Sequence, residues 1–378
     1  MPGSGSRQPA MALCHEWLSG RRGSEVTFEL MARAFPGADL YALTRDPDAG
    51  LDFGGRPVRT TFLDRIGPLR GHNALQLPLM PLAWRYASRT RYDVVVTSSH
   101  ACVKGFGPGR SALHLCYCYT PMRYLWMQEL DRRSPLARLA APLAAGLRAW
   151  DVKSANWVDH FAGISTAVVG RIERFYGRQA RVLHPPVNTR FFTPDPAEPR
   201  SDFVLAFSRM IPNKKLDLAI RAAALAGMPL VVAGSGPQEG DLRTLAARTG
   251  SPVEFVIAPD DETVRRLYRT CRALIFPAEE DFGIVPVEAQ ACGAPVVALG
   301  RGGSLDTVVP GRTGILVERQ EAEEFAEGLR EAVDARFEPG DCVANAGRFS
   351  SERFLSDFTG WVSEAMEAAG IGAPDPYA

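Results

Sequence analysis

The sequence predicts an α/β protein made of two successive doubly wound, Rossmann-like domains. Short apolar, strand-like segments alternate with helix-like segments along most of the chain, a pattern typical of parallel βαβ units. A proline-rich stretch at 184–196 interrupts this alternation, and proline clusters favour domain boundaries. The length of 378 residues, beyond the usual size of a single domain, also indicates two domains.

The first half contains five apolar runs short enough to be strands, and most of them end in a polar turn. We expect strands at 11–15, 39–43, 92–98, 112–117 and 160–165. Between them, longer segments with apolar residues at helical spacing predict helices at 25–35, 136–154 and 168–176.

The same alternation restarts after the proline-rich stretch. It predicts strands at 203–207, 229–233, 253–257, 273–276 and 295–298, and helices at 216–226, 238–249 and 261–271. An amphipathic helix at 351–368 ends the pattern. We therefore expect a disordered N-terminus over 1–10, domains at 11–190 and 191–348, and a final helical segment at 349–378.

Composition excludes several classes of protein. The 43 basic and 43 acidic residues cancel, which argues against a nucleic-acid partner. No apolar run reaches the roughly 18 residues needed to span a bilayer, and the polar first residues do not resemble a signal peptide, so we expect a cytoplasmic protein. The seven cysteines lack the paired spacing of a metal site and are expected to be buried free thiols. No zinc-helix, nucleophile-elbow or phosphate-loop motif is present.

The most informative segment is an acidic motif at 277–289. It places Glu280 just after the strand at 273–276, and Glu288 in the first turns of the next helix. Ligands of open α/β sheets bind at this end of the strands. The backbone N–H groups of Phe282, Gly283, Ile284 and Val285 lie near the helix start, where they can bind an anion such as a diphosphate. Carboxylates accept hydrogen bonds from hydroxyls, so the motif suits a sugar nucleotide.

A basic loop after the strand at 203–207 supplies the opposite charge. Arg209 and Lys214 are five positions apart and could converge on one diphosphate without a metal. Gly234 follows the next strand, where a glycine permits close backbone approach or is simply part of a turn. Gly23, in the loop at 20–24, either forms the opposite wall of the diphosphate site or belongs to a plain turn.

Other strand ends carry residues for which two roles are possible. Tyr119 and His100 follow two strands of the first domain; each is either a site residue or a packing, capping or surface residue. The loop at 302–304 either faces the same crevice at the strand ends or forms a turn with a helix N-cap at Ser304.

Taken together, these residues resemble the retaining glycosyltransferases of family four, which have the GT-B fold. The resemblance covers about residues 11–365, and its most specific part is Glu280 and Glu288 with seven residues between them. The segments at 98–101, 120–124, 208–214 and 276–289 are similar to a bacterial subgroup of mannosyltransferases that use GDP-mannose.

This resemblance implies a role for each matching residue. Arg209 and Lys214 would bind the donor diphosphate, Glu288 the nucleotide ribose, and Glu280 the donor sugar. The acceptor would bind to the domain at 11–190 and the nucleotide sugar to that at 191–348, while the final helix crosses back to the first domain. The acceptor would attack from the face that the nucleotide leaves, and a donor phosphate oxygen would take its proton. No cofactor or metal is then expected.

The sequence departs from the family pattern at three informative positions. Tyr119 stands where the family has a histidine that contacts the donor sugar, which leaves the sugar open. Ser24 replaces a common glycine. Ile257 replaces a frequent glycine near the expected base pocket, so both GDP and UDP remain candidates.

Two other functions remain as alternatives: a sugar-nucleotide-binding protein without catalytic activity, and a sugar-nucleotide epimerase. The acceptor, a small molecule, a glycan or a lipid-linked sugar, is not specified by the sequence. A peripheral contact with the inner face of a membrane, through the helix near 136–150, is a further hypothesis. The oligomeric state is not predicted.

Overall fold

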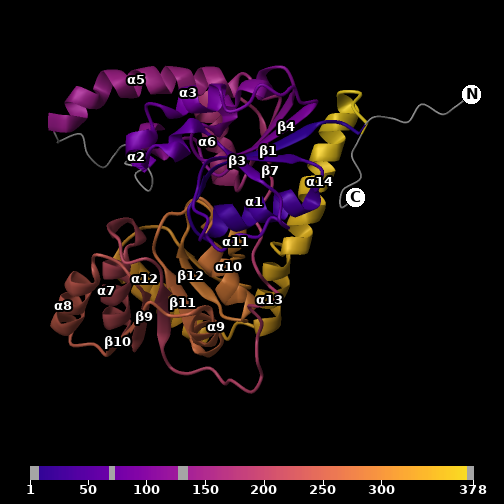
Figure 1. Cartoon of the computed structure of the whole chain (residues 1–378). Helices are drawn as coiled ribbons and strands as arrows, with labels where there is room; N and C mark the ends of the chain where they lie inside the picture. Colours follow the sequence, from indigo (N-terminus) through magenta and orange to yellow (C-terminus); the bar gives the residue numbers. More distant parts are fainter. Residues whose placement is uncertain (1–7, 68–72, 127–134, 373–378) are drawn as a thin grey trace, which may run out of the picture. The chain divides into compact units, whose positions relative to one another are not determined.

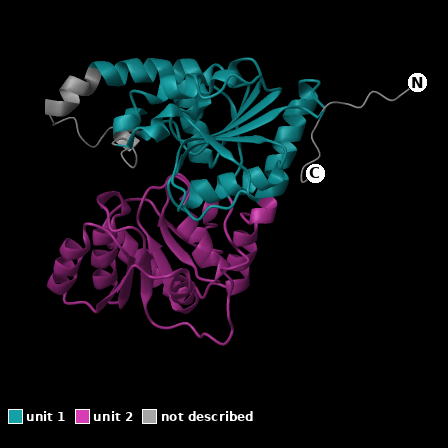
Figure 2. Cartoon of the chain, viewed as in Figure 1, with its two compact units in different colours: residues 1–185, 354–378 teal, residues 186–353 magenta. Residues whose placement is uncertain are grey.

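A computed structural model of the chain describes residues 8–67, 73–126 and 135–372. It divides into two compact units, each with its own parallel sheet (Figure 1). Unit 1 comprises Met1–Pro185 and Phe354–Ala378, and unit 2 comprises Pro186–Arg353 (Figure 2). The chain passes from unit 1 to unit 2 between Pro185 and Pro186, inside the proline-rich stretch.

Unit 1 is built on a seven-stranded parallel sheet with the order β3-β2-β1-β4-β5-β6-β7. Its strands are β1 (Met11–Leu18), β2 (Asp39–Arg45), β3 (Val58–Thr60), β4 (Val94–Ser99), β5 (Leu113–Cys118), β6 (His160–Gly163) and β7 (Ala180–Val182). Its α-helices are α1 (Gly23–Ala34), α2 (Asn73–Gln76), α3 (Met80–Arg85), α4 (Arg123–Trp126), α5 (Pro135–Ala155) and α6 (Thr166–Tyr176). The short 3-10 helices are η1 (Phe62–Arg65), η3 (Val103–Gly105) and η4 (Gly107–Arg110).

Unit 2 is built on a six-stranded parallel sheet with the order β10-β9-β8-β11-β12-β13. Its strands are β8 (Val204–Phe207), β9 (Leu230–Gly234), β10 (Val253–Ile257), β11 (Ala273–Phe276), β12 (Val296–Leu299) and β13 (Gly314–Val317). Its helices are η5 (Pro212–Lys214), α7 (Leu216–Ala226), α8 (Glu239–Thr249), α9 (Asp261–Thr270), α10 (Ile284–Ala291), α11 (Ser304–Thr307), α12 (Ala322–Asp334) and α13 (Pro339–Gly347). The two doubly wound domains expected from the sequence are therefore confirmed.

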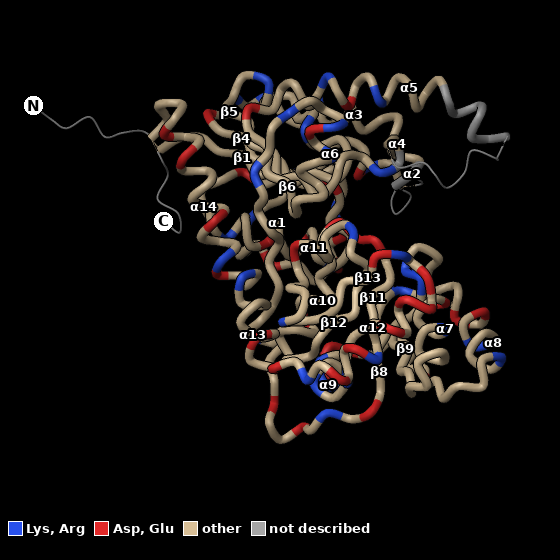
Figure 3. Tube along the Cα trace, turned by 180° about the vertical axis from the view of Figure 1, so that it is seen from behind, with Lys and Arg blue, Asp and Glu red and all other residues tan. Residues whose placement is uncertain are grey.

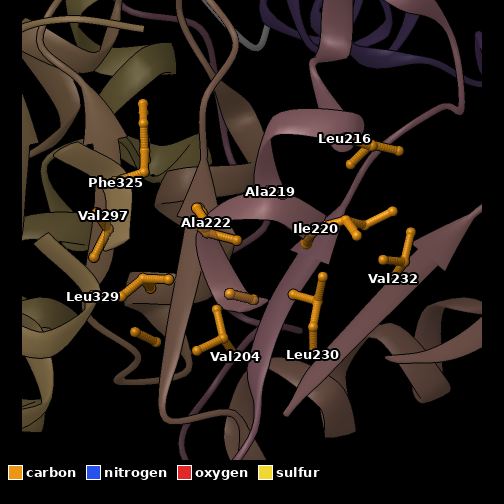
Figure 4. Close-up of a cluster of buried hydrophobic side chains, with 14 of the residues drawn as sticks. Val204, Leu216, Ala219, Ile220, Ala222, Leu230, Val232, Val297, Phe325 and Leu329 are labelled. Carbon is orange, nitrogen blue, oxygen red and sulfur yellow. The ribbon is translucent and has the colours of Figure 1, made fainter. Parts of the chain in front are cut away.

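Alternating side chains of the unit 2 strands build two cores, one on each face of the sheet. On one face, side chains from β8, β9 and β12 pack against α7 and α12, as in the cluster around Val204, Ile220 and Leu329 (Figure 4). On the other face, α10 packs on β11, β12 and α13. Because both faces are covered, the strands read as continuous apolar runs rather than alternating ones.

The final helix, α14 (Ser351–Ala368), belongs to unit 1 from Phe354 onward. The Phe354 ring lies 5.8 Å from the Tyr117 ring, and the Phe358 ring lies 5.8 Å from the Phe35 ring. Two large aromatic side chains thus attach this helix to residues more than 200 positions earlier in the sequence.

The structure adds elements that the sequence did not reveal. The strands β3, β7 and β13 have only three or four residues, too short for a recognisable pattern. The strand β1 extends to Leu18 instead of ending at His15, although it contains His15 and Glu16. Both polar side chains are fully buried, which a strand tolerates only when they have internal partners.

All seven cysteines are free and buried, which confirms the prediction made from their spacing. Within residues 8–67, 73–126 and 135–372, no helix is both long and apolar enough to cross a membrane.

Candidate functional site

In unit 2 the carboxyl ends of β8 and β11 mark the point where the strand order reverses. These two strands are neighbours, but the chain leaves β8 toward α7 and leaves β11 toward α10, on the opposite face of the sheet. Parallel sheets bind ligands in the crevice that such a divergence opens. The two loops concerned, 208–215 and 277–283, carry Arg209, Lys214 and Glu280, so unit 2 brings together most of the predicted site residues.

The Lys214 ammonium group contacts the Glu280 carboxylate and forms an ion pair between the two loops. The side chains are 14% and 18% exposed, so each remains accessible to a ligand. Arg209 is exposed on the same loop as Lys214. A bound diphosphate would offer Lys214 a second anionic partner, and a sugar hydroxyl would offer Glu280 a hydrogen-bond donor.

Gly234 supports the basic loop through close backbone approach. A Cβ atom at Gly234 would lie 1.9 Å from the Ser208 carbonyl oxygen, and the φ of +134° is one that side-chain-bearing residues rarely adopt. The Ser208 N–H donates to the Ala233 carbonyl oxygen at 3.1 Å. The Met210 N–H donates to the Ser235 carbonyl oxygen at 2.8 Å. The predicted close approach at Gly234 is therefore to the backbone beside Arg209.

Gly302 and Gly303 support the acidic loop in the same way. A Cβ atom at Gly302 would lie 2.3 Å from the Glu280 carbonyl oxygen, and one at Gly303 would lie 2.2 Å from the Phe282 Cα atom. The Gly303 N–H also donates to the Glu280 carbonyl oxygen at 2.8 Å. The alternative of an N-cap at Ser304 is wrong: Gly303 is the N-cap residue of α11, because Ser304 already lies within the helix.

The start of α10 leaves backbone N–H groups available to an anion. Its N-cap is Gly283, with a φ of +88° and no side-chain hydrogen bond, so the first amides lack an intrahelical acceptor. Ile284 and Val285 are the first two helical residues. The Phe282 side chain is buried against Phe349, with ring centroids 5.4 Å apart, so only its backbone can serve a ligand.

The Glu288 carboxylate has one fixed partner. The Tyr268 hydroxyl, on a fully buried side chain, donates to the Glu288 Oε2 atom at 2.9 Å. Burial raises the pKa of Glu288 to about 7, although the Tyr268 hydrogen bond opposes this shift by favouring the charged form. Glu288 is therefore held in one orientation and can change its charge near neutral pH.

In the sheet of unit 1 the strand order reverses between β1 and β4. Tyr119 directly follows β5, the strand beside β4. The Tyr119 hydroxyl accepts a hydrogen bond from Ser98 Oγ at 3.1 Å and donates one to the Ser24 carbonyl oxygen at 3.1 Å. Ser98 Oγ also lies 3.0 Å from Nδ1 of the buried His15. These bonds tie the first turn of α1, which contains Ser24, to the sheet.

His100 follows β4 at the unit 1 reversal point. Its ring lies 5.0 Å from Trp17 and 5.9 Å from Tyr119 between ring centroids, and the side chain is 25% exposed. Nδ1 of His100 lies 3.6 Å from Oε2 of Glu16. The buried Glu16 carboxylate accepts backbone N–H groups of His100, Ala101 and Val103 at 2.8–2.9 Å, and so holds the loop after β4.

Three residues of these sites were missed in the sequence. Tyr268 shares the buried face of α9 with Val264, so its spacing reads as core packing. His15 and Glu16 interrupt an otherwise apolar strand, and this interruption is the signal that could have identified them. Gly23, predicted as part of a binding loop, is the first residue of α1, and its carbonyl oxygen accepts from Thr27 Oγ1 at 2.7 Å.

Comparison with solved structures identifies the architecture. Sucrose-phosphate synthase from Thermosynechococcus elongatus superposes with a TM-score of 0.72 at 22% identity, covering 96% of this chain and all of that chain. Anabaena HepE, solved with UDP and glucose, gives a TM-score of 0.66 at 19% identity, covering 93% of this chain and 99% of that one. The fold is therefore that of the GT-B glycosyltransferases, as the sequence resemblance implied.

Sequence comparison is more specific for unit 2. Residues 189–348, which make up most of unit 2, match the model of the family described as glycosyl transferases group 1. A D-inositol 3-phosphate glycosyltransferase from Mycobacteroides abscessus is 34% identical over 200 residues, 48% of this chain and 43% of that protein.

A second relative comes from Corynebacterium glutamicum. It is a GDP-mannose-dependent monoacylated α-(1-6)-phosphatidylinositol monomannoside mannosyltransferase, 30% identical over 204 residues, 47% of this chain and 53% of that protein. The chain thus matches about half the length of these curated relatives.

Proposed function

We propose that the protein is a retaining glycosyltransferase that moves a hexosyl group from a nucleoside diphosphate sugar to an acceptor hydroxyl. The observation that carries the proposal is the Lys214–Glu280 ion pair at the reversal point of a domain that matches the group 1 glycosyltransferase family. A cation for the diphosphate and a carboxylate for the sugar then lie side by side at the start of α10, where a phosphate would also meet free backbone N–H groups.

The proposed roles follow from position in unit 2. Arg209 and Lys214 neutralise the diphosphate, and so take the part that a metal ion plays in other transferases. Glu280 accepts hydrogen bonds from sugar hydroxyls. Glu288 accepts them from the ribose, because its Oε2 atom is held by Tyr268 and its Oε1 atom is left for a ligand.

In the transfer step, the bond from the anomeric carbon to the phosphate oxygen breaks, and a bond from that carbon to the acceptor oxygen forms. The proton of the acceptor hydroxyl passes to the departing phosphate oxygen, so the diphosphate leaves with the electron pair and the proton. The positive charges of Arg209 and Lys214 stabilise the negative charge that develops on the leaving group.

The donor is proposed to be GDP-mannose or a related sugar nucleotide, since one relative is a GDP-mannose-dependent enzyme. UDP sugars remain in the proposal, because Ile257 leaves the base open. The cytoplasmic location expected from the sequence stays a prediction.

The test is nucleotide release from a panel of GDP and UDP sugars, with product anomers assigned by NMR. Lys214→Ala and Glu280→Gln should each lower turnover by at least about a hundredfold, as expected for groups that act on developing charge. Tight donor binding without turnover toward any acceptor or water would instead support the non-catalytic alternative. Conversion of the sugar nucleotide into its epimer, without release of the nucleotide, would support the epimerase alternative.

A further inference from the structure

A stripe of apolar side chains on unit 1 points away from its core. Leu75 on α2, Leu79 and Leu82 at α3, and Tyr86 just after α3 are 60%, 39%, 48% and 63% exposed. Their spacing of four, three and four residues places them along one side of a helical path.

The opposite side of this path is already used by the fold. Gln76, Met80, Ala83 and Trp84 are completely buried, and the last three belong to the core of unit 1. A helical segment that is apolar on both sides normally lies inside a protein. Among the residues that the structure describes, no other part of unit 1 covers the outer stripe.

A neighbouring element extends the apolar surface. The 3-10 helix η1 packs beside α3, and Phe62 and Ile66 at its two ends are 40% and 37% exposed. We call these six side chains the leucine face: Phe62, Ile66, Leu75, Leu79, Leu82 and Tyr86. Exposed apolar side chains gathered on neighbouring elements in this way often mark an interaction site.

Arginines dominate the charges around the leucine face, although Asp64 lies in η1 between Phe62 and Ile66, where it accepts the Arg45 backbone N–H at 3.2 Å. Basic and acidic positions are interspersed along the trace of both units (Figure 3), and the chain as a whole is neutral. From residue 65 to residue 92, however, the sequence contains arginines and no Asp or Glu. Arg65, Arg85, Arg89 and Arg91 are exposed, and the Arg85 guanidinium lies 5.4 Å from the centre of the Tyr86 ring.

We propose that the leucine face docks unit 1 on the surface of a membrane that contains anionic lipids. Exposed leucines can enter the boundary between head groups and acyl chains, tyrosine is favoured at that depth, and arginines bind the lipid phosphates. A neutral apolar partner would not require the excess of arginines, whereas an anionic lipid surface does. Combined with the proposed function, this docking would bring the enzyme to acceptors held at the membrane, but the docking does not depend on that function.

The experiment is co-sedimentation of the full chain with vesicles of phosphatidylcholine, alone or mixed with phosphatidylglycerol. We expect the protein to pellet with the mixed vesicles, to pellet less as salt rises, and to remain in solution with phosphatidylcholine alone. The double variant Leu79→Glu, Leu82→Glu should weaken the binding by more than about tenfold.

Two controls separate this face from others. Leu225→Glu and Leu305→Glu alter leucines of unit 2 that are equally exposed, at 50% and 56%, and should pellet like the parent. Leu143→Glu alters α5, the helix for which the sequence raised the hypothesis of a membrane contact, and should also pellet like the parent. The double variant should keep the far-UV circular dichroism and the thermal unfolding midpoint of the parent, which shows that unit 1 is folded, and calorimetric binding of GDP and UDP to unit 2 should be unchanged.

Three results would overturn the proposal. The first is a parent that does not pellet with the mixed vesicles. The second is a loss of pelleting in Leu143→Glu while the double variant still pellets. The third is a parent that forms a concentration-dependent oligomer in the absence of vesicles while the double variant stays monomeric. The leucine face would then bind a second copy of the chain. Failure of nucleotide binding would instead count against the proposed function and leave the docking result intact.

Discussion

The Tyr268 hydroxyl donates a hydrogen bond to the Glu288 carboxylate at 2.9 Å, from a side chain that is completely buried. The ring of Tyr268 is fixed by Phe192 and Phe207, whose centroids lie 5.6 Å and 5.9 Å away. The hydrogen bond therefore sets the orientation of Glu288 and determines which of its oxygens faces a ligand. It also favours the charged carboxylate in surroundings that otherwise favour the neutral acid.

Tyr268→Phe should therefore change how donor binding depends on pH. Removing the hydrogen bond raises the pKa of Glu288 further above 7, so less of the carboxylate is charged at neutral pH. We expect nucleoside diphosphate binding to weaken about tenfold near pH 7 and to recover near pH 9. Calorimetric titrations over pH measure this, with 2′-deoxynucleotide as the control that lacks a ribose hydroxyl. A weakening that is the same at every pH would contradict a role through Glu288.

Glu288→Gln should make unit 2 more stable at the cost of donor binding. The pKa of Glu288 is about 7 in the folded state against a usual 4.5, so ionisation costs stability as the pH rises between these values. Because glutamine carries no charge, the variant should gain about 1–3 kcal/mol over the parent above pH 7, and little below pH 4.5. Urea unfolding at several pH values tests this. Glu254→Gln, exposed on β10, should show no such pH-dependent gain.

Gly234→Ala should disrupt the basic loop. The added methyl would collide with the Ser208 carbonyl, which belongs to the backbone and cannot yield as a flexible side chain does. We expect a loss of about 3 kcal/mol or more in stability, together with weaker diphosphate binding. The matched control is Gly240→Ala in α8, where no atom lies within 4 Å and alanine favours the helix. Equal unfolding midpoints for the two variants would count against this explanation.

Tyr119→Phe should loosen the first turn of α1. The variant loses the bond to the Ser24 carbonyl oxygen and leaves Ser98 with one partner fewer, at a cost of about 1–2 kcal/mol. Tyr117→Phe, two positions earlier, is the matched control. The Tyr117 hydroxyl is buried without a hydrogen-bond partner in the part of the chain that the structure describes, so its removal should be neutral or stabilising. Thermal unfolding, and amide exchange in the first turn of α1, compare the two variants. A larger loss of stability in Tyr117→Phe would refute the assignment.

Lys104→Met should destabilise unit 1 strongly. The Lys104 ammonium group forms a buried ion pair with Asp151, whose other oxygen accepts from Tyr176 and Trp126 at 2.8 Å. Removing the cation leaves a buried carboxylate without its counter-charge, at a cost of about 3–5 kcal/mol. A second change, Asp151→Leu, should recover part of this loss. If urea unfolding shows that the stability loss of the double variant equals the sum of the losses of Lys104→Met and Asp151→Leu alone, the two side chains are not coupled.

Local sequence patterns predicted most strands of both sheets, because fully covered parallel strands read as apolar runs. They failed for β3, β7 and β13, whose few residues show no periodicity, and for the outer half of β1. Local patterns also did not predict which atoms Gly234 and the glycines at 302–303 approach. The distance from Gly234 to Ser208 is set by the pairing of β8 with β9, which no local pattern contains.

The class of the fold, the place of the proline-rich boundary and the spacing of Glu280 and Glu288 about the start of one helix can all be read from the chain alone. These features depend on residues close together in the chain. Three contacts appear only in the folded protein. Lys214 contacts Glu280, 66 positions away, Tyr268 orients Glu288, and the Tyr119 hydroxyl bonds to Ser98 and Ser24. Each of these contacts joins the ends of different elements, so it exists only once strand order brings those ends together.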